Sequence, residues 1–164
     1  MSDLPEPSIA TIRVDYSLIL LSSGTDGVTP SATELKESNG LIVVTHGGAA
    51  IITGIGSGTV EVSVELVDGE PKGGLGEWEE MVDVSIDASA GDLRVTTVLG
   101  DVPDLPALSA KGPGLYRVRC LAKGRELHPS GVEIESAERY RLIAWPAPGS
   151  PPIDHRVLPS KFSR

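Results

Sequence analysis

A regular alternation of apolar and polar residues recurs along the chain, and it limits the fold more than any other feature. In Thr59–Val67 every second residue is Val or Leu, and Glu or Ser stands between them. Comparable alternation occurs in Met81–Asp87, Leu115–Ala122 and Glu138–Trp145. Successive side chains of a strand point to opposite faces, so each segment predicts a strand with one face in the core and the other facing solvent. No segment keeps the 3.6-residue period of a helix over about ten residues, and the chain is therefore predicted to be all-β.

Less regular apolar runs predict further strands. Thr11–Leu21 is expected to form one strand that is buried on both faces toward its end, and Asp92–Leu99 a later one. Leu41–His46 and Ala50–Thr53 predict a hairpin that turns at Gly47 and Gly48, because glycine adopts the positive φ angles of a tight turn without strain. We expect the large aromatic side chains to lie in the core or at its rim: Tyr16, Trp78, Tyr116 and Tyr140.

The remaining segments are typical of loops. Ser22–Asn39 holds few apolar residues, but Ser31 precedes Glu34 at capping-box spacing, which predicts one helical turn at Ser31–Lys36. The chain has 19 Gly and 13 Pro, and they lie between the apolar runs, as is usual where many turns join short strands. The fold expected is an antiparallel two-sheet sandwich of about eight strands, with a proline-rich C-terminal tail.

The length of 164 residues suits a single domain, which buries roughly 70% of the surface of its unfolded chain. We assign residues 1–10 to a flexible arm, 11–148 to one β-sandwich domain and 149–164 to the proline-rich tail. Four prolines between Pro146 and Pro152 favour an extended trace, so the tail is predicted to be either a strap on the surface or a free interaction arm.

The formal net charge of −9 restricts the partners that the protein can have. Nucleic acid and anionic membranes would be repelled, whereas a cationic protein would be attracted. The first residues are acidic where a signal peptide would be basic, and no apolar run approaches the roughly 18 residues of a membrane span, so we expect a soluble, cytoplasmic protein. The single Cys120 lies on the apolar face of a strand and is interpreted as a buried hydrophobic residue.

No stretch of the sequence carries a catalytic or cofactor motif. His46, His128 and His155 are not spaced as metal ligands, and one cysteine excludes sulfur-rich zinc sites. Gly54–Gly58 has the glycines of a phosphate-binding loop, but a strand pattern follows it instead of a helix, so it is interpreted as a flexible turn. Gly-x-Ser-x-Gly is absent, and Glu79 and Glu80 would point to opposite faces of a strand. We therefore predict no metal, no organic cofactor and no enzymatic activity.

Charge is distributed unevenly along the sequence. Residues 59–92 hold ten acidic residues and one basic one, whereas residues 111–141 hold seven basic and four acidic residues. The ordinary interpretation is that these segments are neighbouring strands whose charges pair on a solvated face. The functional alternative is that outward-facing acids form a docking surface and that the arginine-rich strands, with their tryptophan, form a second contact. The candidate partner-binding residues are Glu61, Glu65, Asp83, Asp87, Arg117, Arg119, Arg139, Arg141 and Trp145.

Two segments resemble a known family. Gly114-Leu-Tyr-Arg-Val-Arg-Cys120 and Tyr140-Arg-Leu-Ile-Ala-Trp145-Pro-Ala-Pro148 are similar to the late strands of ComJ-type competence proteins, which are small acidic inhibitors of a DNA-entry nuclease. A wider set of bacterial proteins of unknown function ends in a similar segment. The likeness covers Trp78–Pro148 and lies in packing positions, so no functional residue is transferred. It implies a nuclease-inhibitor or immunity-type role.

These observations favour a non-enzymatic, acidic protein-binding module, an inhibitor or immunity-type partner of a basic protein such as a nuclease. The alternative is a structural or assembly subunit of a phage particle or secretion apparatus, in which strand edges and the tail would join neighbouring subunits. A homo-oligomer is compatible with either hypothesis. A ligand-binding or hydrolytic sandwich is a third class, for which the sequence offers no candidate residue.

Overall fold

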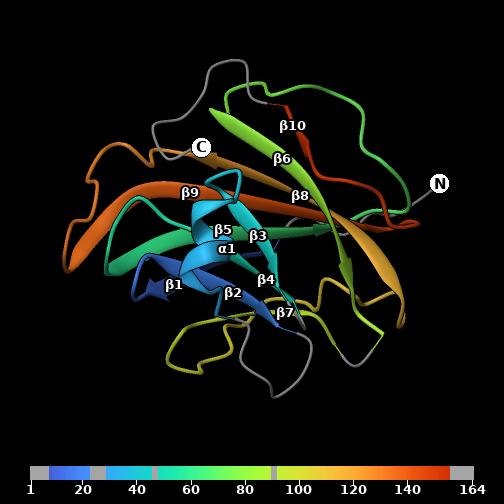
Figure 1. The fold of residues 1–164 in the computed structure, drawn as a ribbon, viewed down its shortest axis with the longest axis horizontal. Helices are drawn as coiled ribbons and strands as arrows, with labels where there is room; N and C mark the ends of the chain where they lie inside the picture. The colour runs from blue at the N-terminus through green and yellow to red at the C-terminus, as the bar shows by residue number, and fades with distance from the viewer. Residues whose placement is uncertain (1–7, 23–28, 46–47, 90–91, 156–164) are drawn as a thin grey trace.

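The computed structural model in Figure 1 describes residues 8–22, 29–45, 48–89 and 92–155. Within them lie ten strands and one short helix, mostly in the segments that the alternation predicts. The strands are β1 (Ser8–Val14), β2 (Leu18–Ser22), β3 (Ile42–Thr45), β4 (Gly48–Ile52), β5 (Gly58–Leu66), β6 (Glu80–Asp87), β7 (Arg94–Thr96), β8 (Leu115–Lys123), β9 (Ile134–Pro146) and β10 (Ile153–Asp154), and the helix is α1 (Ala32–Lys36).

The strands form two sheets, and one of them is not antiparallel as expected. The large sheet has the order β1-β5-β9-β8-β6-β10, and the small sheet has the order β3-β4-β2-β7. β8 and β9 pair antiparallel, as predicted, and so do the strands of the small sheet. β5 and β9, however, are parallel, which makes the large sheet mixed. Side chains alternate in the same way in both kinds of pair, so the sequence pattern could not distinguish them.

The core lies between the inner faces of the two sheets. The large sheet contributes the alternate aliphatic residues of β5 and β6, together with Tyr116, Cys120 and Tyr140. The small sheet contributes Ile19 and Ile51, among others. Tyr116 and Tyr140 are each at most 3% exposed, which confirms the prediction that they lie in the core. Cys120 is fully buried, as expected for a residue on the apolar face of its strand.

The predicted first strand, Thr11–Leu21, is divided by a tight turn. β1 and β2 belong to different sheets, and residues 15–17 between them include Tyr16 and Ser17 with φ angles of 56° and 60°. The side chain of Tyr16 is 78% exposed, so the expectation that it lies near the core is wrong. Apolar residues recur at every second position from Ile12 through Tyr16 to Leu20, which is why the turn has no signal in the hydrophobic pattern.

Helix α1 confirms the capping box. The amide of Glu34 donates to Ser31 Oγ at 3.1 Å, and the amide of Ser31 donates to Glu34 Oε1 at 2.9 Å. Leu35 packs against Leu18 and Leu20 on the outer face of the small sheet. The helix therefore covers apolar side chains that the small sheet would otherwise expose to water.

The predicted domain boundaries differ from the strand boundaries. Residues 8–10, assigned above to the flexible arm, already form part of β1, and residues 153–154 of the tail pair with β6 as β10. The grouping of residues 11–148 as one domain stays a prediction. The hairpin of β3 and β4 is present, and its turn at residues 46–47 lies outside the described residues. Among the described residues, no helix is long and apolar enough to span a membrane.

Buried charged residues join the two sheets, a feature that the sequence analysis did not foresee. Arg125, which follows β8 and is 1% exposed, donates to Glu80 Oε1 at 2.6 Å, to the carbonyl of Ile52 at 3.1 Å and to the carbonyl of Gly40. Glu80 belongs to the large sheet and Ile52 to the small one. The guanidinium therefore connects the sheets through the interior.

Glu138, on β9, is the second member of this buried group and is fully inaccessible to solvent. Its carboxylate accepts hydrogen bonds from the amides of Gly54 and Ile55, both at 2.9 Å, and from the hydroxyl of Tyr140 at 2.5 Å. Burial, followed by the charge of Glu138, raises the pKa of Tyr140 well above its ordinary value, so this hydroxyl stays a donor. The carboxylate thus anchors the connection between β4 and β5 to β9.

We expect Glu138→Gln to lower the free energy of unfolding by about 2–3 kcal/mol. The neutral glutamine side chain cannot make charge-assisted hydrogen bonds, and its NH2 group would face the N–H and O–H donors that the carboxylate accepts from. Glu135→Gln is the matched control, since Glu135 is exposed on the same strand and its loss should change stability by no more than about 0.5 kcal/mol. Urea unfolding of both variants measures the difference. Equal stability of the two variants would contradict the role given to the buried carboxylate.

Candidate functional site

All nine candidate residues lie on the outer face of the large sheet. The register sets Glu61 opposite Arg139, Asp83 opposite Arg119, and Arg117 opposite Trp145. Because these strands alternate between core and outer face, the other candidates on the same strands share that face. The nine candidates therefore share one face, as the alternation predicted, but the two halves of this face differ in their exposure.

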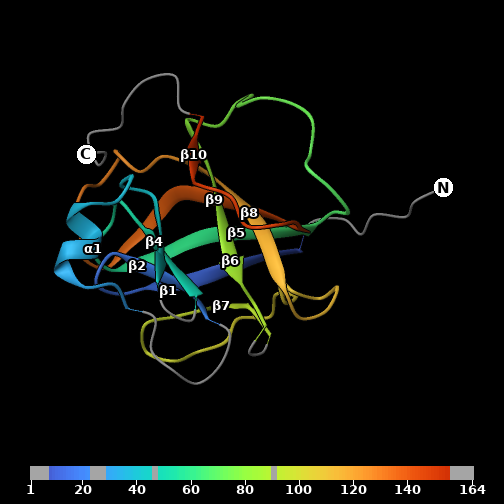
Figure 2. The same ribbon diagram turned by 45° about the vertical axis from the view of Figure 1, so that its right-hand side comes forward.

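One half of the face is covered by other parts of the chain. Asp83, Arg117, Arg119 and Trp145 are only 2%, 5%, 4% and 3% exposed, so the expectation that Asp83 is an outward, solvated acid is wrong. A second apolar cluster explains their burial. It consists of Val67, Met81, Leu121, Ile143 and Trp145, with Leu75, Trp78 and Ala147 packed against it. In Figure 2 the covering segments, residues 67–78 and β10, lie at the top of the molecule, and β7 of the small sheet lies at the bottom.

Asp83 and Arg119 form a buried ion pair within the covered half. Arg119 Nε donates to Asp83 Oδ1 at 2.8 Å, and Nη2 donates to Oδ2 at 2.9 Å. Arg119 Nη1 donates to the carbonyl of Pro71 at 3.2 Å, and its guanidinium lies 5.6 Å from the ring centroid of Trp145. Burial by itself raises the pKa of Asp83, but the hydrogen bonds from Arg119 and His155 outweigh it and hold this pKa below its ordinary value. The Asp83–Arg119 pair therefore has a structural role, because the guanidinium of Arg119 donates to acceptors within the chain.

Residues 150–155 lie against β6 like a strap. Arg117 donates to the carbonyls of Ser150 and Pro151 at 2.9 and 2.7 Å, and also to Ser85 Oγ at 2.9 Å. His155 Nε2 lies 3.0 Å from Asp83 Oδ2, and the amide of His155 donates to the carbonyl of Met81 at 2.8 Å. Residues 156–164 lie outside the described part, so the form of the tail as a whole stays a prediction.

The other half of the face is partly exposed to solvent, and most of its charges are paired. Arg141 donates to Glu65 Oε1 at 2.5 Å, and Arg139 Nε lies 3.8 Å from Glu61 Oε1. Asp87 is exposed at the end of β6 and accepts hydrogen bonds from the hydroxyl and amide of Ser89, which lower its pKa. The four acids therefore do not form one negative face, and cross-strand pairing accounts for Glu61, Glu65, Arg139 and Arg141.

The chemistry available in the described residues is limited. No group of three or more His, Cys, Asp or Glu side chains within them is placed to hold a metal ion. An open pocket of about 680 Å³ adjoins the covered half and is lined by residues 70–75 together with Met81, Arg119 and His155. Arg119 would be its natural anion ligand, but Asp83 and Pro71 already accept from its guanidinium.

We expect Asp83→Asn to lower the free energy of unfolding by about 3 kcal/mol at pH 7, because it leaves the buried Arg119 without its counter-charge. The pKa of Asp83 is lower in the folded chain than in the unfolded one. Its stabilising effect is therefore complete above the pKa of an unfolded aspartate, about 3.9, and is lost as the pH falls through the lower pKa of the folded chain. Urea unfolding should show the same difference in stability between wild type and variant at pH 7 and 5, and a smaller difference at pH 3.

The control for this prediction is Glu70→Gln. Glu70 Oε2 lies 3.9 Å from Arg119 Nη2, and its side chain is 73% exposed, so its loss should change stability by less than about 0.5 kcal/mol at any of these pH values. A gap for Asp83→Asn that stays constant down to pH 3 would show that packing, and not the carboxylate charge, is responsible.

Comparison with known proteins supports the likeness seen in the sequence at the level of fold. No protein-family model matches the chain, and no curated protein matches its sequence. The crystal structure of ComJ from Bacillus subtilis, described as an inhibitor of the DNA-degrading activity of NucA, superposes with a TM-score of 0.59 at 14% identity, covering 89% of this chain and 100% of ComJ. A protein described as crocagin biosynthetic gene J superposes with a TM-score of 0.51 at 17% identity, covering 88% of this chain and 100% of the other. The chain therefore shares the fold of ComJ and of the crocagin biosynthetic protein.

Proposed function

We propose that this chain is a non-enzymatic acidic protein that binds a basic protein, such as a nuclease, as an inhibitor or immunity-type partner. The observation that carries the proposal is the internal pairing of its positive charges. In the described part of the chain, eight Lys or Arg side chains lie within 4.0 Å of a carboxylate: Arg13, Arg94, Lys111, Arg119, Lys123, Arg125, Arg139 and Arg141.

The net charge of −9 must then act outward mainly through carboxylates that these bases do not neutralise. Exposed examples are Glu34 on α1, Glu37 at the C-cap of that helix, and Asp101 and Asp104 after β7. A field of one sign accelerates encounter with a partner of the opposite sign, and it weakens as salt is added. The arrangement suits a positively charged protein, and it disfavours nucleic acid.

The shared fold adds support of a second kind. ComJ is an inhibitor of a DNA-degrading protein, and a related architecture here is compatible with the same class of activity. At 14% identity the likeness concerns the fold alone, and the crocagin biosynthetic protein shows that the fold also occurs in another context. The proposal therefore rests on charge, with the fold as its context.

The test is affinity capture followed by an activity assay. The tagged chain is incubated with lysate of its source organism at about 50 and 500 mM salt, and retained proteins are identified by mass spectrometry. We expect one stoichiometric protein with a basic isoelectric point, retained at the lower salt and weakened at the higher, because surface charges are screened within about 4 Å at the latter. Its purified activity, assayed as DNA degradation if it is a nuclease, should fall as the chain is added.

Two outcomes would contradict the proposal. Retention of only neutral or acidic proteins would remove the electrostatic argument. Recovery of only further copies of this chain would favour the alternative, an assembly subunit that joins its neighbours through strand edges.

A further inference from the structure

Strained backbone is concentrated at one end of the molecule. Within the described residues, four non-glycine residues have positive φ angles: Tyr16 (56°), Ser17 (60°), Ser130 (59°) and Glu133 (54°). Such residues are uncommon, and a cluster of them persists only where surrounding contacts hold it in place. The first two lie in the turn between β1 and β2, and the other two lie in the loop before β9. These two segments are more than 110 residues apart in the sequence.

The connection between β4 and β5 holds the two strained segments together. Ser17 donates its amide to the carbonyl of Gly56 at 2.9 Å, and Gly56 donates its own amide to the carbonyl of Gly131 at 2.7 Å. The amide of Ser130 donates to the carbonyl of Gly54 at 2.7 Å, and the amide of Glu133 donates to Ser57 Oγ at 3.0 Å. We call residues 15–17, 54–57 and 128–133 the three-loop tip.

The glycines of Gly54–Gly58 are explained by this close contact. A Cβ atom on Gly54 would meet the carbonyl oxygen of Arg125 at 1.9 Å, and one on Gly58, where φ is 135°, would meet that of Ile134 at 2.0 Å. The segment interpreted from the sequence as a flexible turn is therefore packed against the loop before β9. The buried Glu138 carboxylate fastens the same segment from beneath, through the amides of Gly54 and Ile55.

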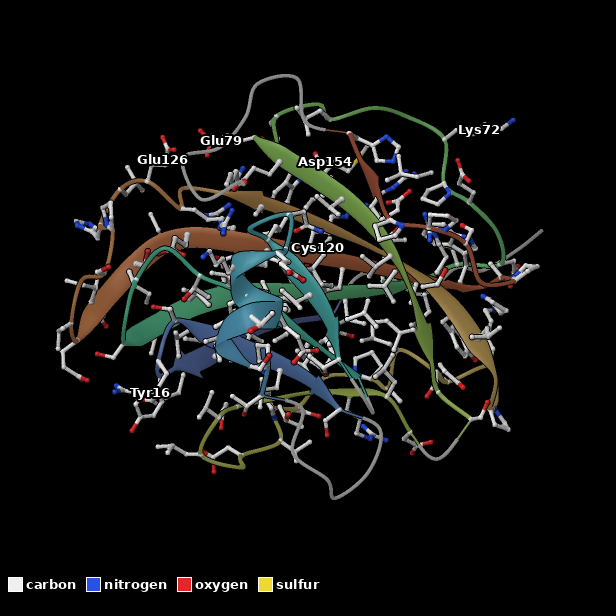
Figure 3. The ribbon with its side chains drawn as sticks, viewed as in Figure 1. Tyr16, Lys72, Glu79, Cys120, Glu126 and Asp154 are labelled. Carbon is white, nitrogen blue, oxygen red and sulfur yellow. The ribbon has the colours of Figure 1, made fainter. Side chains whose placement is uncertain are left out.

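Despite this internal order, the tip exposes large apolar side chains. Tyr16 is 78% exposed and Val132 is 72% exposed. Figure 3 shows Tyr16 at the edge of the molecule, at the opposite end from Lys72. β7 pairs antiparallel with β2, and Val98 packs in the same cluster as Leu18, so the turn after β7 lies beside the tip and adds Leu99, which is 69% exposed. A rigid backbone that presents apolar side chains to water is typical of a binding surface.

The charge around these apolar residues is negative. Arg13 bridges Asp15 and Glu133, with its guanidinium 3.1 and 2.5 Å from their carboxylate oxygens. Glu135 lies on the same face, since the register sets Arg13 opposite Thr59 and Thr59 opposite Glu135. Three carboxylates against one guanidinium leave a net charge of −2 on this part of the surface. A basic surface on the partner is therefore complementary to the rim of the tip.

We propose that the three-loop tip, with Tyr16 as its central anchor and Val132 and Leu99 beside it, is the surface that docks a basic protein. This inference rests on the proposed function and specifies which surface performs it. Tyrosine is among the residues that dominate binding energy at interfaces, because it buries a large ring at low entropic cost. The hydrogen bonds that hold the tip in the free protein reduce the ordering that docking requires.

The first experiment places the photo-crosslinking residue p-benzoylphenylalanine at position 16 of the full chain in cells of the source organism. The same residue at position 9 is the control, because Ile9 is 61% exposed but lies at the far end of β1 from the tip. We expect position 16 to crosslink to one protein with a basic isoelectric point, and position 9 to leave that protein unlinked.

The second experiment measures the affinity of that basic protein for purified variants. Tyr16→Asn removes the ring, and asparagine tolerates a positive φ, so the turn is retained and the melting temperature should be close to that of the wild type. We expect it to weaken binding at least about tenfold, as expected for the loss of an interface anchor, whereas Ile9→Ser should stay within about twofold of wild type. Val132→Ser should also weaken binding while leaving the salt dependence unchanged.

The outcomes separate this inference from the proposed function. If a basic protein binds the wild type and Tyr16→Asn equally well, or crosslinks from position 9 and not from position 16, the tip is not the docking surface although the proposed function stands. Crosslinks from position 16 only to an acidic protein or to a second copy of this chain, or to nothing, would overturn the tip as a site for a basic partner. If the tip binds a basic protein whose activity the chain leaves unchanged, the docking surface stands and the inhibitor function fails.

Discussion

The hydrogen bonds of the buried charged residues Arg125, Glu80 and Glu138 are the interactions on which the rest of the structure depends. Arg125 joins Glu80 of the large sheet to backbone carbonyls at Ile52 and Gly40 on the small-sheet side. Glu138 fastens the connection between β4 and β5 to β9. Buried charges are tolerated when they are paired or well hydrogen-bonded: Arg125 pairs with Glu80, and the Glu138 carboxylate accepts hydrogen bonds from two backbone amides and a tyrosine hydroxyl. Hydrophobic burial stabilises the sandwich but is non-directional, so it does not select particular partners. These hydrogen bonds do, and they specify how the two sheets and the loops are joined.

The outer face of the large sheet shows how the same kind of residue can serve two purposes. Arg119 and Arg117 hold the covering segments in place, and Trp145 forms part of a second apolar cluster beneath them. Arg139 and Arg141, farther along β9, pair with acids of β5 in contact with solvent. Arg119, Arg139 and Arg141 thus pair with carboxylates of the chain itself, and Arg117 donates to backbone carbonyls. The negative charge that remains is what a partner would encounter.

Much of the fold could be predicted from the alternation of residues. Most of the strands, the antiparallel β8–β9 pair and the capped helix at residues 32–36 were expected and are present, whereas β10 was not expected. The parallel β5–β9 pair was missed because alternation is the same in parallel and antiparallel strands. The turn at Tyr16 was missed because apolar strands adjoin it on both sides. Of the candidate site, the sequence identified the face but not its exposure, since nothing near Asp83 in the sequence indicates that residues 71 and 155 contact its ion pair.

The sequence by itself therefore determined the class of fold, the acidic character and the faces on which charged residues of the strands lie, because these depend on local periodicity and composition. The tertiary structure alone decided which strands are neighbours, which charges are buried, and which distant loops meet at the three-loop tip. Those properties depend on contacts between residues up to 120 positions apart, as with Arg13 and Glu133. Local sequence pattern contains no information about such pairs, since their energies arise only after the chain has brought them together.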